Sequence, residues 1–318
     1  MITALAGGVG AARLLRGLVR VVPPTQVTAV VNTGDDTVLH GLVICPDLDS
    51  VTYTLAGLND EERGWGRRGE TWTVMDALAK LGGETWFRLG DLDLATHLYR
   101  SQRRAEGAAL STVTAEITRA LGVAARLVPV TDDELRTRVT LADGPEVSFQ
   151  DYFVRHQHAV AVASVRFDGA ERCRPAPGVV DALERADVLV VCPSNPIVSI
   201  GPLLAVPGIA ERLRRRRGDV VAVSPIVAGA ALRGPADRLM RELGHEPSVL
   251  GVARLYAPLV GTVVIDEADA AQEAAVEDLG VRCVVAPTVM HEVDDAARLA
   301  AVVLDAVTGS PVVDGPTR

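Results

Sequence analysis

The sequence predicts an α/β fold, namely a Rossmann-like, doubly wound and mostly parallel sheet that carries an inserted α+β subdomain. Short apolar runs recur along the chain without polar alternation, as expected of parallel strands buried on both faces. Polar or glycine-rich turns and then helical patterns follow these runs. A hydrophobic content of 48% in 318 residues is enough for one large domain with an extensive core.

The first strand–helix unit begins at the N-terminus. An apolar run over residues 1–6 stops at Gly7, Gly8, Val9 and Gly10, and a helical pattern follows. Glycines let the backbone approach a ligand closely, and the free N–H groups at a helix start favour an anion. We interpret this loop as a phosphate cradle, with a plain strand–helix turn as the alternative. It lacks the Gly-Lys-Ser/Thr of a Walker loop and the full dinucleotide fingerprint.

The second predicted strand, residues 27–31, ends in a polar turn that contains Asn32, Asp35 and Asp36. Ligands of open α/β sheets collect at the carboxyl ends of the strands. The two adjacent carboxylates could therefore contact ribose hydroxyls, a base edge or a metal. The alternative is a turn that ends in a helix N-cap.

A pair of carboxylates, Asp47 and Asp49, follows Pro46. We expect Pro46 to exclude a helix here, so the pair should lie on an extended or turning segment ahead of a helix that starts near Val51. Such a pair can ligate Mg²⁺ or orient a hydroxyl nucleophile. A carboxylate directly before a helix can also serve only as its cap.

Residues 60–155 differ in composition and are predicted to form the inserted subdomain. The segment is rich in charge up to about residue 110 and holds all three tryptophans, which could cover a ring system or simply pack. In it, Arg88 and a strand-like stretch precede a second carboxylate pair, Asp91 and Asp93, and a helix with His97. A helix over 111–121 with Ser111 as N-cap, a strand over 125–130 and a hairpin over 137–149 are expected next.

The pattern of parallel strands resumes after the insertion. The run 187–191 ends at Ser194 and Asn195, which lie between two prolines and offer hydrogen-bonding groups at a further strand end. Strands are also predicted over 220–224, 261–266 and 281–286, and a last helix near 294–307. The single domain is expected to span residues 1–310, with 311–318 as a disordered tail.

Composition excludes several classes of protein. The net charge of −9 argues against general nucleic-acid binding, and no apolar run reaches the roughly 18–20 residues of a membrane helix. Four scattered cysteines and the lack of a signal-peptide pattern predict buried, reduced thiols in a cytoplasmic protein. Lys80 is the only lysine, so a phosphate clamp must use arginine, backbone amides or metal.

Familiar hydrolytic motifs are missing from the sequence. It contains neither the Gly-x-Ser-x-Gly elbow of α/β-hydrolases nor the His-Glu-x-x-His of zinc proteases. The remaining pattern of glycine-rich and polar loops with carboxylate pairs fits a nucleotide or diphosphate enzyme that uses Mg²⁺. Such chemistry requires mainly positioning and neutralisation of charge.

Together these segments resemble the CofD-like 2-phospho-L-lactate transferase family, which includes the actinobacterial-type phosphoenolpyruvate transferase of coenzyme F420 biosynthesis. The resembling segments occur in family order over nearly the whole chain. They are residues 7–10, 31–36, 46–49, 89–97, 149–151, 193–202 and 224–226.

The resemblance implies transfer of a phosphoenolpyruvyl or 2-phospholactyl group from a guanosine diphosphate-linked donor to the deazaflavin Fo, with release of GMP. It also implies Mg²⁺ as cofactor, a homodimer, and binding of the acceptor by the inserted subdomain 60–155. By resemblance, the residues that contact the acceptor are Asp49, Arg88, Asp91 and His97. Asp49 is also the expected catalytic residue, and the expected metal ligands are Asp47 and Asp49. The nucleotide-binding set is Gly7, Gly8, Val9, Gly10, Asn32, Asp35, Asp36, Ser194 and Asn195.

Two residues depart from the family pattern. Val9 stands where relatives often have threonine, which leaves the cradle to backbone amides, and Arg238 stands where they often have lysine. The arginine-rich, lysine-poor composition favours a phosphoenolpyruvyl donor, because it is typical of GC-rich bacterial genomes. The alternatives are a CofD-like nucleotide-binding regulator without transferase activity and a nicotinamide-dependent oxidoreductase, which the incomplete glycine fingerprint disfavours.

Overall fold

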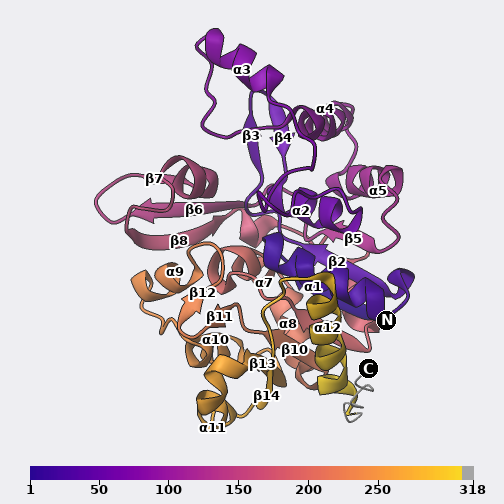
Figure 1. The fold of residues 1–318 in the computed structure, drawn as a ribbon, viewed down its shortest axis with the longest axis vertical. Coiled ribbons are helices and arrows are strands. Elements are labelled where there is room, and N and C mark those ends of the chain that lie inside the picture. The colour runs from indigo at the N-terminus through magenta and orange to yellow at the C-terminus, as the bar shows by residue number, and fades with distance from the viewer. Residues whose placement is uncertain (310–318) are drawn as a thin grey trace.

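The computed structural model describes residues 1–309, and it confirms the predicted α/β class. A seven-stranded sheet in the order β14-β13-β10-β9-β1-β2-β5 forms the centre, and every neighbouring pair is parallel (Figure 1). Its strands are β1 Ile2–Ala6, β2 Val27–Val31, β5 Arg126–Pro129, β9 Val188–Val191, β10 Val220–Val223, β13 Thr262–Asp266 and β14 Arg282–Ala286. The predicted tail, 311–318, lies outside the described residues.

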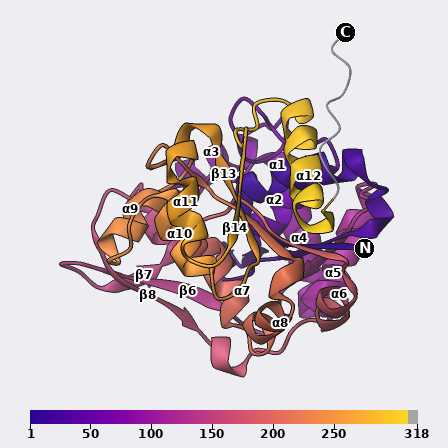
Figure 2. The ribbon, with the colours of Figure 1, turned by 90° about the horizontal axis from the view of Figure 1, so that it is seen from below.

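Helices cover both faces of the sheet and bury two apolar clusters. Leu5 of β1 belongs to one cluster and Ala4 to the other, because successive side chains of a strand point to opposite faces. Figure 2 shows two helices of one face, α1 (Gly8–Val21) and α12 (Val293–Thr308), side by side. The other helices on the sheet faces are α2 Pro46–Leu55, α5 Leu110–Ala120, α6 Val179–Arg185, α7 Gly201–Ala205, α8 Ile209–Arg215, α9 Ala236–Glu242, α10 Val249–Tyr256 and α11 Glu273–Glu277.

The strand order places a topological switch point between β1 and β9. The chain proceeds outward from β1 through β2 to β5, then returns to β9 on the other side of β1 and continues through β10, β13 and β14. Open α/β sheets bind ligands in the crevice at such a reversal, beyond the carboxyl ends of the strands. The loops after β1 and β9 are therefore where a ligand is expected.

Two groups of elements lie outside the central sheet. Above it in Figure 1 stand the hairpin β3 (Thr37–Leu39) and β4 (Leu42–Ile44) with α3 (Thr73–Lys80) and α4 (Asp91–Ala105). Beside it lies an antiparallel sheet in the order β7-β6-β8. Its strands are β6 Arg136–Leu141, β7 Glu146–Ser148 and β8 Val162–Asp168, which confirms the predicted hairpin.

The segment 60–155 does not stand apart from the sheet as a whole. Its strand β5 pairs with β2 in parallel register, and Leu110 of α5 packs in a core cluster of the main domain. Only the parts around α3 and α4 and around β6 and β7 project from the central layers.

Three local predictions were wrong. Pro46 does not exclude a helix but begins α2, because the first helical position needs no N–H donor. Residues 86–89 form no strand; instead Phe87 and Leu89 pack into an apolar cluster with α3 and α4. Ser111 is not the N-cap of α5, since the helix begins at Leu110 and the Asp132 carboxylate accepts a hydrogen bond from the Ser111 N–H (2.6 Å).

The four cysteines are buried and free, as predicted. Among the described residues, no single helix is long and apolar enough to cross a membrane. A bent pair, Pro196–Ala205 with Ile209–Arg215, passes such a test by length and composition only. Several of its side chains, among them Leu203 and Leu213, belong to the core.

Candidate active site

The glycine loop and the loop after β9 are packed together at the switch point. The Gly7 N–H donates to Ser194 Oγ (3.3 Å), and the Ser194 hydroxyl donates to the Gly7 carbonyl (2.7 Å). A Cβ added at Gly10 would collide with the carbonyl oxygen of Pro193. Ser194 and Gly7, both in the predicted nucleotide-binding set, are therefore in direct contact, and Gly10 is required by close backbone approach. Asn195 caps the adjacent π-helical turn η4 (Pro196–Ile200) through Oδ1.

Asp47 lies directly against the glycine loop. Its carboxylate accepts from Asn32 Nδ2 (2.9 Å) and from the Gly8 N–H, while Asn32 Oδ1 accepts from the Gly34 N–H (2.8 Å). Burial raises the pKa of Asp47 to about 6, against the lowering effect of these hydrogen bonds. The backbone N–H of Gly8, at the end of α1 that attracts anions, is thus already bonded to the Asp47 carboxylate. A phosphate that binds beside Asp47 would be repelled by this carboxylate unless a cation lies between them or Asp47 carries a proton.

Two more buried carboxylates, Asp35 and Asp36, follow β2. Burial, and next the charge of Asp47, raises the pKa of Asp35 well above its ordinary value. Burial raises the pKa of Asp36 to about 7, although a hydrogen bond from Cys45 and the charge of Arg100 act in the opposite direction. Groups with pKa values displaced by burial in a ligand-binding crevice are candidates for proton transfer or metal binding.

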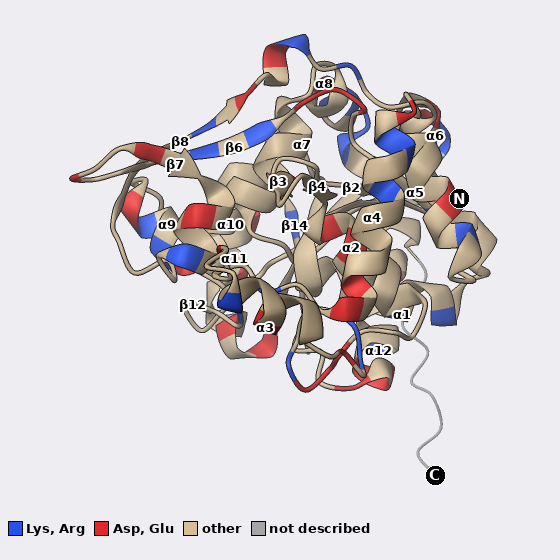
Figure 3. Ribbon diagram, turned by 90° about the horizontal axis from the view of Figure 1, so that it is seen from above, with Lys and Arg blue, Asp and Glu red and all other residues tan. Residues whose placement is uncertain are grey.

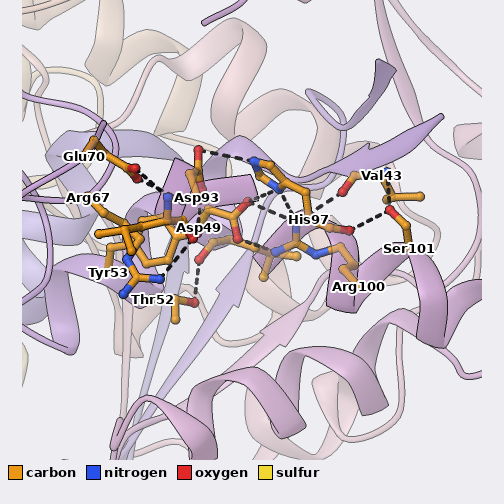
Figure 4. A network of polar contacts seen from close by, with 12 residues as sticks. Val43, Asp49, Thr52, Tyr53, Arg67, Glu70, Asp93, His97, Arg100 and Ser101 are labelled. Carbon is orange, nitrogen blue, oxygen red and sulfur yellow. Dashed lines mark hydrogen bonds and ion pairs between the residues drawn. The ribbon is translucent and has the colours of Figure 1, made fainter. Parts of the chain in front are cut away.

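Asp49 is held by an arginine that the sequence reading did not single out. Arg100 of α4 reaches both carboxylate oxygens of Asp49, with Nη1 at 3.1 Å from Oδ2 and Nη2 on Oδ1 (Figure 4). Both side chains are almost fully buried, and Arg100 also donates to the Val43 carbonyl (3.3 Å). Burial alone would lower the pKa of Arg100, but the charge of Asp49 and other neighbours raises it overall.

The network continues through His97 and returns to α2. His97 Nδ1 lies 3.2 Å from Arg100 Nη1, and its Nε2 lies 3.2 Å from Asp93 Oδ2. The Tyr53 hydroxyl donates to Asp93 Oδ1 (2.6 Å), which closes a ring of contacts between α2 and α4. Because arginine cannot accept a hydrogen bond, a neutral His97 accepts through Nδ1 and carries its proton on Nε2, toward Asp93.

Possible ligand atoms of Asp49, Asp93 and His97 lie within 4.8 Å of one another. This set fits Mg²⁺ poorly, because Mg²⁺ prefers oxygen ligands and the Arg100 cation already neutralises Asp49. Asp47 and Asp35, which share hydrogen bonds with Asn32, offer oxygen ligands next to the glycine loop.

Two predicted acceptor residues have other contacts. Arg88 is exposed and stacks on the ring of Trp72 at 4.5 Å. Asp91 accepts from the Thr73 and Val74 N–H groups and so caps α3, while Glu70 accepts from two N–H groups at the start of α4. The structure therefore brings Asp49 and His97 together but leaves Arg88 and Asp91 outside this network.

Two cavities flank the carboxylates. One of about 320 Å³ lies beside the start of α1 and is lined by Val9, Arg13, Tyr53, Trp65 and His291, among others. The other, of about 240 Å³, is lined by Asp35, Asp36 and residues of β6 such as Arg136 and Arg138. Tyr53 and Arg100 were missed by sequence reasoning, although the spacing of Asp93, His97 and Arg100 predicts a common helix face.

The family model for 2-phospho-L-lactate transferase CofD matches residues 2–306. The chain belongs to the CofD family. CofD-family relatives named phosphoenolpyruvate transferase include one from Kitasatospora aureofaciens, 45% identical over 305 residues, which are 94% of this chain and 95% of the relative. Another, from Mycolicibacterium smegmatis, is 40% identical over 324 residues, covering 96% of this chain and 98% of the relative.

The fold is also found in a solved structure. A crystal structure of a Bacillus halodurans protein of the UPF0052 family matches with a TM-score of 0.61 and 17% identity, covering 95% of this chain and 98% of the other. At this identity the likeness concerns the fold alone. Family membership itself confirms the resemblance predicted from the glycine, aspartate and Pro-Ser-Asn-Pro segments, and it identifies the chain as a transferase.

Proposed function

We propose that this chain transfers a phosphoenolpyruvyl group from a guanosine diphosphate-linked donor to the deazaflavin Fo, releasing GMP and forming dehydro coenzyme F420-0. A 2-phospholactyl donor, which would give F420-0, is the second form of the same reaction. The names of the actinobacterial relatives support the phosphoenolpyruvyl form. The observation that carries the proposal is the convergence of the glycine loop, Asn32, Asp47 and Ser194 at the switch point of the sheet.

The reaction breaks the phosphoanhydride bond of the donor and forms a phosphate ester bond to the acceptor. A terminal ribityl hydroxyl of Fo attacks the phosphorus next to the three-carbon acid, the bond from this phosphorus to the bridging oxygen breaks, and GMP leaves with that oxygen. The hydroxyl proton passes to a base. In this scheme the N–H groups at the start of α1 bind diphosphate oxygens, which stabilises charge on the leaving group.

Mg²⁺ is part of the proposal, and the residues that fit it best are Asp47 and Asp35. When bound, the metal would neutralise charge on the diphosphate. The fit rests on the position of Asp47 against Gly7 and Gly8. Asp47 Oδ2 lies 3.1 Å from the position that a Cβ on Gly7 would occupy. An anion bound in the cradle would therefore lie next to the ionised Asp47 carboxylate, and a cation between the two would offset their repulsion. Asp49 fits the metal less well than predicted, because Arg100 engages both of its oxygens.

The base is proposed among the buried carboxylates. Burial raises the pKa of Asp36 to about 7, which suits proton transfer near neutral pH, whereas Asp47 is assigned to the metal. Asp49 keeps its proposed role as an orienting group through its contacts with Arg100 and, by way of α2, with Tyr53 at the cavity wall. Acceptor binding by residues 60–155, including Arg88, and assembly as a homodimer are further parts of the proposal.

The test is incubation of the purified chain with Fo, donor and Mg²⁺, followed by measurement of GMP release. Release that requires Fo supports the transferase. A regulator would bind nucleotide without releasing GMP in the presence of Fo, and an oxidoreductase would bind NAD and not GDP.

A further inference from the structure

Three arginines gather at the cavity beside α1. Arg13 and Arg16 are one turn apart on α1 and both line the cavity. Arg233 comes from the loop before α9, and its guanidinium lies so close to Gly64, another lining residue, that an added Cβ there would collide with it. Burial lowers the pKa of Arg13, and the charges of Arg233 and Arg16 lower it further. Positive charge is therefore concentrated at this wall of the cavity.

The acidic residues of the same cavity do not neutralise this charge fully. Glu61 pairs with Arg16, and Asp60 pairs with Arg63 at 2.8 Å. Glu292 caps α12, and Glu62 is exposed. Figure 3 shows acidic and basic segments mixed along the loop that follows α2, near the start of α12. Within residues 1–309, neither Arg13 nor Arg233 has a carboxylate oxygen within 4.0 Å.

Arg13 keeps donors available for a ligand. Its Nη1 donates to the Met290 carbonyl at 2.9 Å, which fixes the side chain in place, and a guanidinium has four further N–H donors. Val9, in the first turn of α1 and one residue of the proposed phosphate cradle, lines the same cavity. An anionic group attached to a phosphate in the cradle can thus extend toward Arg13.

We propose that Arg13, assisted by Arg233, binds the carboxylate of the three-carbon acid carried by the donor. This inference rests on the proposed function and adds to it the residues that recognise the transferred group. A guanidinium matches a carboxylate with two parallel hydrogen bonds, and within residues 1–309 neither Arg13 nor Arg233 is paired with a carboxylate. GDP carries the same diphosphate but lacks this carboxylate, so the arginines distinguish the donor from GDP.

The experiment compares the donor with GDP by calorimetric binding, which does not depend on turnover. The variants are Arg13→Gln, Arg13→Lys and Arg233→Gln, with Arg20→Gln as control, because Arg20 is an exposed arginine on the same helix. Loss of a charged hydrogen-bonded pair predicts that Arg13→Gln weakens donor binding by about 10- to 100-fold. GDP binding and the KM for Fo should change by less than about twofold, and Arg13→Lys should recover part of the donor affinity.

The outcomes separate this assignment from the proposed function. Equal weakening of donor and GDP would show that the arginines hold the diphosphate, and unchanged donor binding would show that they hold neither; both overturn the inference. If the wild-type chain binds the donor but releases no GMP in the presence of Fo, the proposed function fails while the carboxylate assignment is still decided by the binding data. Thermal unfolding of each variant shows whether it is folded.

Discussion

Replacing Arg100 by methionine tests whether the buried contact with Asp49 fixes the relation between α2 and α4. The variant keeps side-chain length but leaves Asp49, 5% exposed, as a buried carboxylate without its cation. Removing one partner of a buried ion pair typically costs about 3–5 kcal/mol. We therefore expect the free energy of unfolding of Arg100→Met to fall by about that amount at pH 8.

The assay is equilibrium urea unfolding at pH 8, with the double variant Arg100→Met/Asp49→Asn as control. The double variant removes the unpaired charge and should regain most of the loss. A single variant within about 1 kcal/mol of wild type, or a double variant no more stable than the single, would refute the reasoning.

Three further predictions concern the carboxylates and the glycine loop. Asp36→Asn should be more stable than wild type at pH 8. Burial raises the pKa of Asp36 from 3.8 to about 7, so the folded wild-type protein carries no charge penalty at this site below pH 3.8. The penalty of the buried charge appears as the pH rises through 7, and asparagine avoids it. The gain, at most about 4 kcal/mol in urea unfolding, should decrease toward pH 4; a pH-independent difference would contradict it. In Gly10→Ala the new methyl group collides with Pro193, so the free energy of unfolding should fall by about 1–3 kcal/mol and most activity should be lost. Gly218→Ala is the control, because no atom lies within 4 Å of its new methyl group, and it should unfold like wild type. Equal losses in the two variants would exclude the packing argument. Asp47→Asn should weaken Mn²⁺ binding, measured by electron paramagnetic resonance with GDP present, by at least about tenfold, and Asp49→Asn should not; the opposite order would move the metal to Asp49.

Much of the fold could be predicted because buried parallel strands leave a strong local signal. The runs at 27–31 and 188–191 are apolar throughout and end in polar turns, and both became strands of the central sheet. The first turn of α2 was missed because proline excludes a helix interior but not a helix start. The allocation of β5 to the main sheet could not be foreseen, since strand pairing depends on tertiary contacts that the local pattern does not record.

The site was predicted in outline but not in its pairings. Local patterns placed Gly7, Asn32 and Ser194 at strand ends, and the sheet brings them together. The partner of Asp49 is Arg100, which lies 51 residues away on a helix without any motif that links it to α2. Long-range ion pairs of this kind depend on how α2 and α4 pack, and the arginine cluster at the cavity depends in the same way on the loop that carries Arg233.

The central claim is that the chain joins Fo to a phosphate-linked three-carbon acid. Mass spectrometry of the product from purified chain, Mg²⁺, Fo and each of the two donors in separate reactions tests it most directly. The account predicts a product with the mass of Fo plus one phosphoenolpyruvyl group, formed in equal amount to GMP and faster than the phospholactyl product. Unmodified Fo with both donors, under conditions in which GDP binds, would contradict it.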